Sequence, residues 1–364
     1  MSKILQVENL VQEFNLTKDF LDKVKFKNGH FSLENRVVHA VNNVSFDVEE
    51  GEVFSLVGES GCGKSTLLRC LAGLESISSG RILLDGEEIT HVPPRQRNVG
   101  MIFQQYSLFP TMNVYNNIAF GLKIQGVTKE EAKIRITEAL KMVDLAGSEQ
   151  KYPSQLSGGE QQRVALCRCI VTKPKVLLMD EPFSAIDAKL RKALQKRIKE
   201  IHRELGMTTI FVTHDQDEAM SMSDTIHLMN QGIVEQSAEP LDLYAHPGTA
   251  FAASFMGNYN MVSAAQFQAV TGDKWKQDVC IRPELIEIFA DSVEDSEKRK
   301  GGYTLSGTVT ERIPQGNTVL YYVTVSDQQF KVSRLFNSPV FFEEGQKVCL
   351  FIPRDAVLQY EKEV

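Results

Sequence analysis

The sequence predicts an α/β domain with a helical subdomain, followed by a small all-β domain, and three features of the chain lead to this prediction. Two short apolar runs, 176–179 and 209–212, are each followed by polar residues and then by a helical pattern, as parallel strands of an α/β sheet usually are. Apolar residues recur at helical spacing over 129–145. After about residue 240 the chain changes to short β-rich runs separated by Gly, Asn and Asp, which is typical of a small β-barrel.

The N-terminal part predicts a strand, a glycine-rich loop and a helix. Residues 3–8 and 44–48 alternate between apolar and polar side chains, which indicates edge strands of a sheet. The polar stretch 15–37 between them has no clear period and is interpreted as a surface insertion. A short apolar run at 53–57 leads into a glycine-rich turn and a helical pattern at 65–73. A strand, a loop and a helix in this order form the context in which phosphate groups bind.

The chain is long enough for two domains, because 364 residues exceed one typical domain. We expect the first domain at 1–240. Its helical subdomain is expected at about 100–170, since a further helical pattern lies at 160–171. We expect the second domain at 241–364, where the short β-rich runs lie.

Composition and charge narrow the function classes. A hydrophobic fraction of 42% and a charged fraction of 24% are those of a globular protein with a large core. The net charge of -7 gives no global attraction to nucleic acid or anionic lipid, so we expect no nucleic-acid partner. The six cysteines form no CxxC pair, which favours reduced thiols in the cytosol. Neither an export signal nor an apolar run of roughly 20 residues is found, so a role at a membrane would require other subunits that cross it.

A glycine-rich segment, Gly58–Ser65, matches the phosphate-binding pattern G-x-x-x-x-G-K-[ST] without a mismatch. Its glycines let backbone N–H groups point at phosphate oxygens, and the helix beginning near Lys64 adds the positive end of its dipole. Lys64 is expected to reach the β- and γ-phosphates of ATP, and Ser65 to ligate Mg²⁺. The alternative is a chance glycine-rich turn, which the strand and helix on either side disfavour. The candidate nucleotide-binding residues are Gly58, Glu59, Ser60, Gly61, Cys62, Gly63, Lys64, Ser65 and Thr66.

Two acidic residues follow the apolar run at 176–179. Asp180 is expected to hold Mg²⁺ through water, and Glu181 to act as the general base that polarises the attacking water. An acidic pair at the end of a strand can also be turn chemistry alone. The phosphate-binding pattern in the same chain favours the catalytic interpretation.

The segment Leu156–Arg163 reads Leu-Ser-Gly-Gly-Glu-Gln-Gln-Arg and resembles the signature motif of the ABC ATPase family. Ser157 and the glycine N–H groups would start a helix and form a second anion site. In that family one chain folds this motif far from its own phosphate loop, so the resemblance implies a head-to-tail dimer of two copies with two ATP molecules between them. The resemblance assigns four residues of the motif to the nucleotide: Ser157, Gly158, Gly159 and Gln161.

Three more segments resemble motifs of this family. Gln104, within Phe103–Pro110, matches the Q-loop, which implies contact with Mg²⁺ and the attacking water and a membrane subunit beside the loop. Ser184–Asp187 resembles the D-loop and places Asp187 at the nucleotide. His214 matches the H-loop, which implies a contact with the γ-phosphate. A lone histidine after a strand is normally a surface residue, but its position beyond the acidic strand end reverses that judgement.

One family position is left open, namely the aromatic ring that stacks on adenine. Phe14 is the candidate by its place on an N-terminal strand. The insertion at 15–37 shifts the register, so Phe14 could equally be a core residue.

The C-terminal part resembles the tail that follows the cassette in sugar, polyamine and ferric-iron importers, through Tyr244–Pro247, Phe255–Asn258 and Ile281–Glu284. That tail implies an oligonucleotide-binding-like β-barrel, often called TOBE. Its role is either regulation or an extension of the dimer interface. No aromatic and basic stripe crosses its strands, so nucleic acid is not expected there.

The leading hypothesis is an ATP-hydrolysing subunit of an ABC importer, peripheral at the cytoplasmic face of the membrane. The resemblance implies a second copy and transmembrane permease subunits as partners, and an extracytoplasmic solute-binding protein indirectly. It favours polyamine as the solute, with ferric iron, sugar or phosphonate as alternatives. A soluble ABC ATPase of translation or repair would carry tandem cassettes, a coiled coil or zinc-binding inserts, and the sequence shows none of these. A regulator without activity is disfavoured because Glu181 and His214 are both intact.

Overall fold

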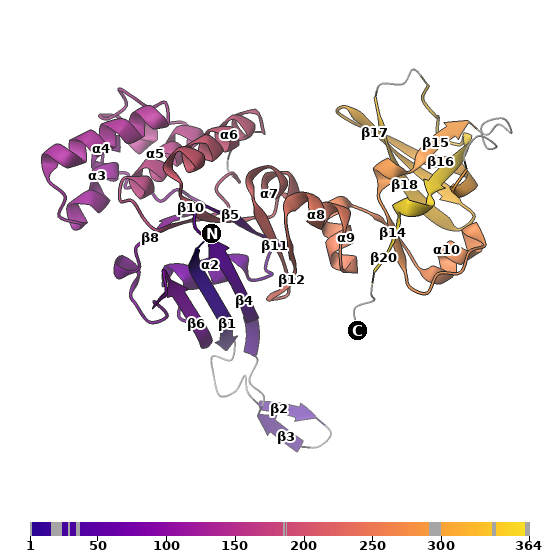
Figure 1. Cartoon of the computed structure of the whole chain (residues 1–364), viewed down its shortest axis with the longest axis horizontal. Coiled ribbons are helices and arrows are strands. Elements are labelled where there is room, and N and C mark those ends of the chain that lie inside the picture. The colour runs from indigo at the N-terminus through magenta and orange to yellow at the C-terminus, as the bar shows by residue number, and fades with distance from the viewer. Residues whose placement is uncertain are drawn as a thin grey trace. The chain divides into compact units, whose positions relative to one another are not determined.

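The computed structural model (Figure 1) describes residues 2–15, 24–27, 30–33, 37–184, 186, 188–290, 300–336 and 340–360. The chain divides into two compact units, Met1–Pro240 and Leu241–Val364. The first unit is α/β and the second contains antiparallel sheets, so the predicted fold class is confirmed. Among the described helices, none has both the length and the apolar character needed to span a bilayer.

A six-stranded sheet forms the centre of the first unit. Its strands are β5 (Val53–Val57), β8 (Val99–Ile102), β9 (Val176–Asp180), β10 (Thr208–Thr213), β11 (Thr225–Asn230) and β12 (Ile233–Ala238). Their order is β12-β11-β5-β10-β9-β8, and all neighbours are parallel except β11 and β12. β5, β9 and β10 are buried along their whole length, which explains why the sequence shows them as short runs rather than as alternating patterns.

A second, antiparallel sheet has the strand order β4-β1-β6-β7. Its strands are β1 (Lys3–Asn15), β4 (Val37–Glu49), β6 (Ser79–Leu84) and β7 (Glu87–Glu88). The strands predicted at 3–8 and 44–48 are parts of the longer β1 and β4. Within the stretch 15–37, interpreted as a surface insertion with no clear period, the chain forms an antiparallel pair of β2 (Val24–Lys27) and β3 (His30–Leu33).

Helix α2 (Lys64–Ala72) packs into a core that both sheets share. Its Leu67 and Leu68 are fully buried together with Leu10 of β1 and Ile210 of β10. The helix therefore cannot shift without disturbing two sheets, and the glycine-rich loop at its N-terminus is held in place.

Three helices make up the predicted helical subdomain, grouped together in Figure 1: α3 (Val114–Ile124), α4 (Lys129–Met142) and α5 (Gly158–Ile170). Each begins at a side-chain cap that accepts a backbone N–H, namely Asn113, Thr128 and Ser157. Ile118 of α3 and Leu140 of α4 are fully buried in their common core. Two more helices, α6 (Ala188–Leu205) and α7 (Gln216–Met222), follow β9 and β10.

The second unit contains two antiparallel sheets, with strand orders β13-β14-β20 and β15-β19-β16-β17-β18. The strands are β13 (Asn260–Val262), β14 (Val279–Ile281), β15 (Glu287–Ala290), β16 (Gly302–Gln315), β17 (Thr318–Val325), β18 (Gln328–Leu335), β19 (Lys347–Pro353) and β20 (Val357–Gln359). Phe267, Tyr321 and Phe330 are fully buried in its core. Three short helices that the sequence did not predict also lie in this region: α8 (Pro240–Ala245), α9 (Ala250–Gly257) and α10 (Ala264–Thr271).

Candidate active site

The phosphate loop joins β5 to α2 and depends on glycine at two close approaches. A Cβ at Gly58 would lie 2.1 Å from the Met229 carbonyl oxygen, and one at Gly63 would lie 1.9 Å from the Ala40 carbonyl oxygen. Gly63 also has a φ of 102°, which side chains rarely adopt. The loop therefore lies directly against β4 and β11, where a side chain at either position would clash.

Lys64 lies at the centre of this loop and is buried. Its Nζ donates hydrogen bonds of 2.7 Å to the carbonyl oxygens of Gly58 and Glu59 and lies 3.4 Å from Cys62 Sγ. The ammonium group is therefore fixed inside the curl of the loop. Its contact with phosphate stays a prediction.

Ser65 and Asp180 bring two oxygen atoms together beside the loop. Ser65 Oγ donates a 2.8 Å hydrogen bond to Asp180 Oδ1, although the residues come from α2 and the end of β9. The Asp180 side chain is buried at the carboxyl end of its strand. A hydroxyl and a carboxylate in contact are ligands of the kind that Mg²⁺ prefers, so these residues fit the ion.

Glu181 connects three segments that the sequence singled out separately. Gln104 Nε2 donates a 2.8 Å hydrogen bond to Glu181 Oε2, and His214 Nδ1 lies 3.5 Å from Glu181 Oε1. The three residues follow β8, β9 and β10, whose carboxyl ends share one edge of the parallel sheet. Glu181 has a φ of 45°, a conformation that is uncommon outside glycine and that is found at functional sites. The carboxylate is thereby aimed between an amide and an imidazole.

A pocket of about 400 Å³ adjoins these groups, and parts of its wall were not predicted. Its lining comprises Val38, His39, Ala40, Ser60, Gly61, Gly63, Lys64, Ser65, Thr66, Glu181, Gln231 and Gly232. The additional residues come from β4 and from the β11–β12 turn. Gly232 N donates to the Cys62 carbonyl oxygen, which ties that turn to the phosphate loop. No local motif marks these residues, because they reach the pocket only through the pairing of distant strands.

Phe14 is half-buried on β1, opposite Val38 in the β1–β4 ladder. Side chains directly opposite each other in an antiparallel pair share one face of the sheet. Phe14 is therefore a neighbour of the pocket wall, but it does not line the pocket itself. Its contact with adenine stays a prediction.

The signature segment starts α5 and is held by a capping box. Ser157 Oγ accepts from the Glu160 N–H, and Glu160 Oε2 accepts from the Ser157 N–H at 2.7 Å. The hydrogen bonds that the Glu160 carboxylate accepts from the N–H and the hydroxyl of Ser157 lower the pKa of Glu160 below its usual value. Gln161 points back, donating through Nε2 to the Leu156 carbonyl oxygen. Within the described part of the chain, Ser157, Gly158, Gly159 and Gln161 lie outside the phosphate pocket. Asp187 lies outside the described residues.

A buried acid supports the loop that carries His214, and sequence reasoning missed it. Glu218 Oε2 accepts a 2.6 Å hydrogen bond from Thr213 Oγ1, and Asp215 Oδ1 accepts from the Glu218 N–H at the start of α7. Arg191 of α6 pairs with Asp215 at 3.1 Å. Burial raises the pKa of Glu218 above its usual value. These contacts hold the loop between β10 and α7 in place, and His214 on this loop is exposed and faces Glu181.

Comparison with known proteins agrees with this geometry. The family model described as ABC transporter matches residues 41–184, and the model described as TOBE domain matches residues 279–358. The spermidine/putrescine import ATP-binding protein PotA of Pasteurella multocida is 38% identical over 96% of this chain and 96% of its own length. The chain belongs to the ABC transporter ATP-binding proteins. Its predicted membership of this family and its assignment as an ATP-binding ATPase are thereby confirmed.

Other members of the ABC transporter family are similar to comparable extents. PotA of Vibrio vulnificus strain YJ016 is 42% identical, covering 85% of this chain and 87% of its own. The sulfate/thiosulfate import ATP-binding protein CysA of Thermosynechococcus vestitus is 43% identical, covering 87% and 93%. Among solved structures, the dimeric ATP-binding cassette MJ0796 bound to ADP and Pi aligns with a TM-score of 0.55 and 28% identity, over 65% of this chain and 99% of its own.

Proposed function

We propose that the chain hydrolyses ATP, together with Mg²⁺, in the pocket beside its phosphate loop and thereby energises the import of polyamines. The observation that supports the chemistry is the Glu181 carboxylate, which lines the pocket and lies between Gln104 and His214. The solute class rests on the 38% identity over 96% of the chain to a protein named for spermidine/putrescine import.

Each residue of the pocket has a role that follows from its position. Lys64 and the loop N–H groups bind the β- and γ-phosphates. Ser65 and Asp180, with Gln104, hold Mg²⁺, which when bound neutralises part of the phosphate charge. Glu181 takes the proton from the attacking water, because its carboxylate faces the pocket and the Gln104 amide holds it in one orientation. His214 donates a hydrogen bond to the γ-phosphate.

A second copy of the chain would complete the site. The signature segment at 157–161 lies outside the phosphate pocket, yet it starts a helix whose free N–H groups suit a phosphate. The head-to-tail arrangement would bring this segment of one copy over the phosphate loop of the other. One similar solved cassette is a dimer bound to ADP and Pi. Asp187 is assigned to the same interface.

The helical subdomain offers a surface for transmembrane permease subunits. A groove of about 550 Å³ lies along α3, and its wall includes Met112, Phe120, Ile124 and Tyr152. Phe120 is 39% exposed and Ile124 is 70% exposed, so the groove presents adjoining apolar surface to which a partner could bind. Docking there would place the chain at the cytoplasmic face of the membrane. An extracytoplasmic solute-binding protein would act through the same permease.

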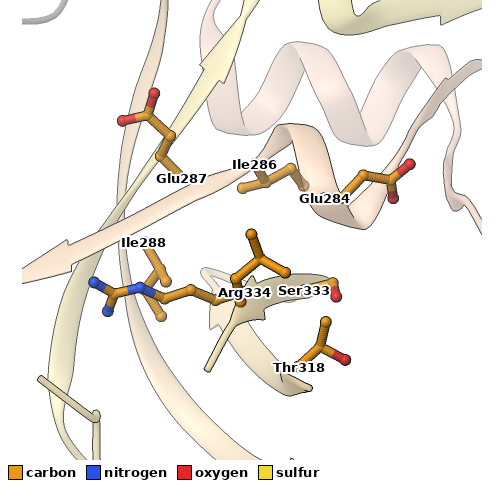
Figure 2. Close-up of a pocket in the computed structure, with 8 residues that line it drawn as sticks. Glu284, Ile286, Glu287, Ile288, Thr318, Ser333 and Arg334 are labelled. Carbon is orange, nitrogen blue, oxygen red and sulfur yellow. The ribbon is translucent and has the colours of Figure 1, made fainter. Parts of the chain in front are cut away.

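For the C-terminal TOBE domain we propose a regulatory or dimerising role. A groove of about 560 Å³ lies in this unit, and Figure 2 shows the Glu284, Glu287 and Arg334 side chains that line it. Ile286 and Ile288 add apolar surface to the same lining. A groove that combines charged and apolar groups suits a small ligand or a segment of another chain.

The transport assignment is tested by uptake of labelled spermidine and of labelled sulfate in cells whose own copy has been removed. Complementation with the wild-type chain should restore spermidine uptake, and Lys64→Ala should not. Sulfate is included because a relative named for sulfate/thiosulfate import is 43% identical. Restored sulfate uptake without spermidine uptake would overturn the polyamine proposal in favour of sulfate.

A further inference from the structure

Arg168, on the last turn of α5, binds the loop that carries Gln104. Its Nη1 donates a 2.7 Å hydrogen bond to the Ser107 carbonyl oxygen, and its Nη2 donates a 3.0 Å bond to the Tyr106 carbonyl oxygen. Its guanidinium also lies over the Phe109 ring, 5.7 Å from the centroid. A planar guanidinium with two parallel donors holds two successive carbonyl groups in one orientation, which an ammonium group cannot do.

The loop conformation that Arg168 holds is an uncommon one. Tyr106 and Ser107 have φ values of 58° and 44°, so two successive non-glycine residues are left-handed. Tyr106 is also buried, and its hydroxyl finds no hydrogen-bond partner among the described residues. Such a conformation persists only where the surroundings fix it. The two hydrogen bonds from Arg168 supply part of that constraint.

Arg168 joins this loop to the signature segment through a single helix. α5 runs without interruption from Gly158 to Ile170, so its N-terminus and Arg168 move together. Gln104, near the start of the same loop, is joined to Glu181 by the 2.8 Å hydrogen bond. A displacement of the signature helix therefore acts directly on the position of Gln104.

The same loop leads into the groove proposed for the membrane subunits. Phe109 packs against Phe120 of α3 with ring centroids 4.8 Å apart. The Asn117 side chain accepts from the Phe109 N–H at 2.8 Å and donates to its carbonyl oxygen at 3.1 Å. Arg168 therefore contacts a segment that is fixed at one end to Glu181 and at the other to the groove along α3.

We propose that Arg168 is a positioning residue that couples the signature helix to both Gln104 and the α3 groove, an inference that rests on the proposed function. When ATP draws the signature segment onto a second copy, α5 pulls the loop through the two carbonyl groups that Arg168 holds. The groove on α3 moves with the loop because Phe109 packs against Phe120 of α3. Because α3 also packs against α5 in their common core, Arg168 adds a second link to that contact, and without it the effect of nucleotide binding on the groove becomes smaller.

The test compares amide hydrogen exchange with and without ATP and Mg²⁺ in the full chain, in a Glu181→Gln background that retains the nucleotide. In this background, ATP should slow exchange at the phosphate loop 58–66 and at α3. With Arg168→Ala added, the slowing at 58–66 should persist and the slowing at α3 should be clearly reduced. Arg168→Lys should show an intermediate effect, since one ammonium group replaces two fixed donors.

Arg135→Ala is the matched control. Arg135 is also half-buried in the helical subdomain and also donates to a backbone carbonyl, that of Val171 at 3.3 Å, but it does not touch the loop. It should leave the ATP effect on α3 unchanged. Equal slowing at α3 with and without Arg168, or the same reduction in Arg135→Ala, would overturn the inference alone. Absence of any ATP effect at 58–66 would overturn the proposed function and this inference with it.

Discussion

Replacement of Arg97 by alanine tests whether the phosphate-loop helix is held from its C-terminal end. Arg97 is only 4% exposed and makes four hydrogen bonds to backbone carbonyl oxygens. Nη1 donates to Cys70 at 2.7 Å and Leu71 at 2.9 Å, Nε donates to Val92 at 2.7 Å, and Nη2 donates to Thr90 at 2.8 Å. The first two carbonyl groups belong to the last turn of α2, where the Gly73 N–H also donates to the Cys70 carbonyl oxygen at 3.0 Å.

The expected loss can be worked out from these contacts. A hydrogen bond from a charged donor contributes about 1.5 to 3 kcal/mol, but burying the guanidinium costs part of this, and burial indeed lowers the pKa of Arg97. We therefore take roughly 1 kcal/mol for each of the four bonds, which gives a loss of about 4 kcal/mol in the free energy of unfolding. For a domain of this size, that loss lowers the Tm by roughly 8 to 16 °C.

The measurement is thermal and urea unfolding of the full chain, followed by circular dichroism. Arg95→Ala is the control, because Arg95 is exposed in the same turn and should change the free energy by less than about 0.5 kcal/mol. Arg97→Lys should recover only part of the stability, since one ammonium group cannot reach all four carbonyl groups. A loss of less than about 1 kcal/mol in Arg97→Ala would refute the reasoning.

Two further predictions concern a thiol and a buried histidine. Cys62 Sγ lies 3.4 Å from Lys64 Nζ inside the phosphate loop, so alkylation with N-ethylmaleimide should abolish ATPase activity. The Cys62→Ser variant should keep its activity under the same treatment. Equal inactivation of both proteins would contradict this prediction. Burial against Phe54 lowers the pKa of His227 to about 4, whereas the pKa of histidine in the unfolded chain is about 6.5. The free energy of unfolding is therefore highest above pH of about 6.5, and this part of it is lost as the pH falls towards about 4. His227→Phe should remove this pH-dependent part of the free energy of unfolding, roughly 3 kcal/mol, in unfolding curves measured at a series of pH values. Identical pH dependence in both proteins would show that His227 is not the group responsible.

The chemical centre could be predicted from the sequence because its residues lie in short contiguous motifs. Gly58 to Ser65 fix their own backbone geometry, and Asp180 and Glu181 directly follow a buried strand. Parallel strands bring their carboxyl ends to one edge of a sheet, so the loops carrying Gln104 and His214 had to converge near that edge. The structure adds the distances that join these groups.

Other parts depend on contacts between distant segments and leave no local pattern. Val38 and Gln231 line the pocket only because β4 and the β11–β12 turn reach the phosphate loop through strand pairing. Arg97 and Arg168 act through backbone carbonyl groups, which any sequence offers, so nothing in the chain marks them beforehand. The helices after β12 are only six to eight residues long, so they are too short to show a clear helical period in the sequence.

The most direct measurement of the central claim is the ATPase rate and oligomeric state of Glu181→Gln beside the wild-type chain, with ATP and Mg²⁺ present. Glutamine keeps the size of the side chain and a hydrogen-bonding partner for Gln104, but it cannot take a proton from water. We predict that hydrolysis falls by at least about 100-fold and that the variant elutes as an ATP-bound dimer, because the closed pair is no longer reopened by hydrolysis. Hydrolysis at the wild-type rate would contradict the assignment of Glu181 as the general base.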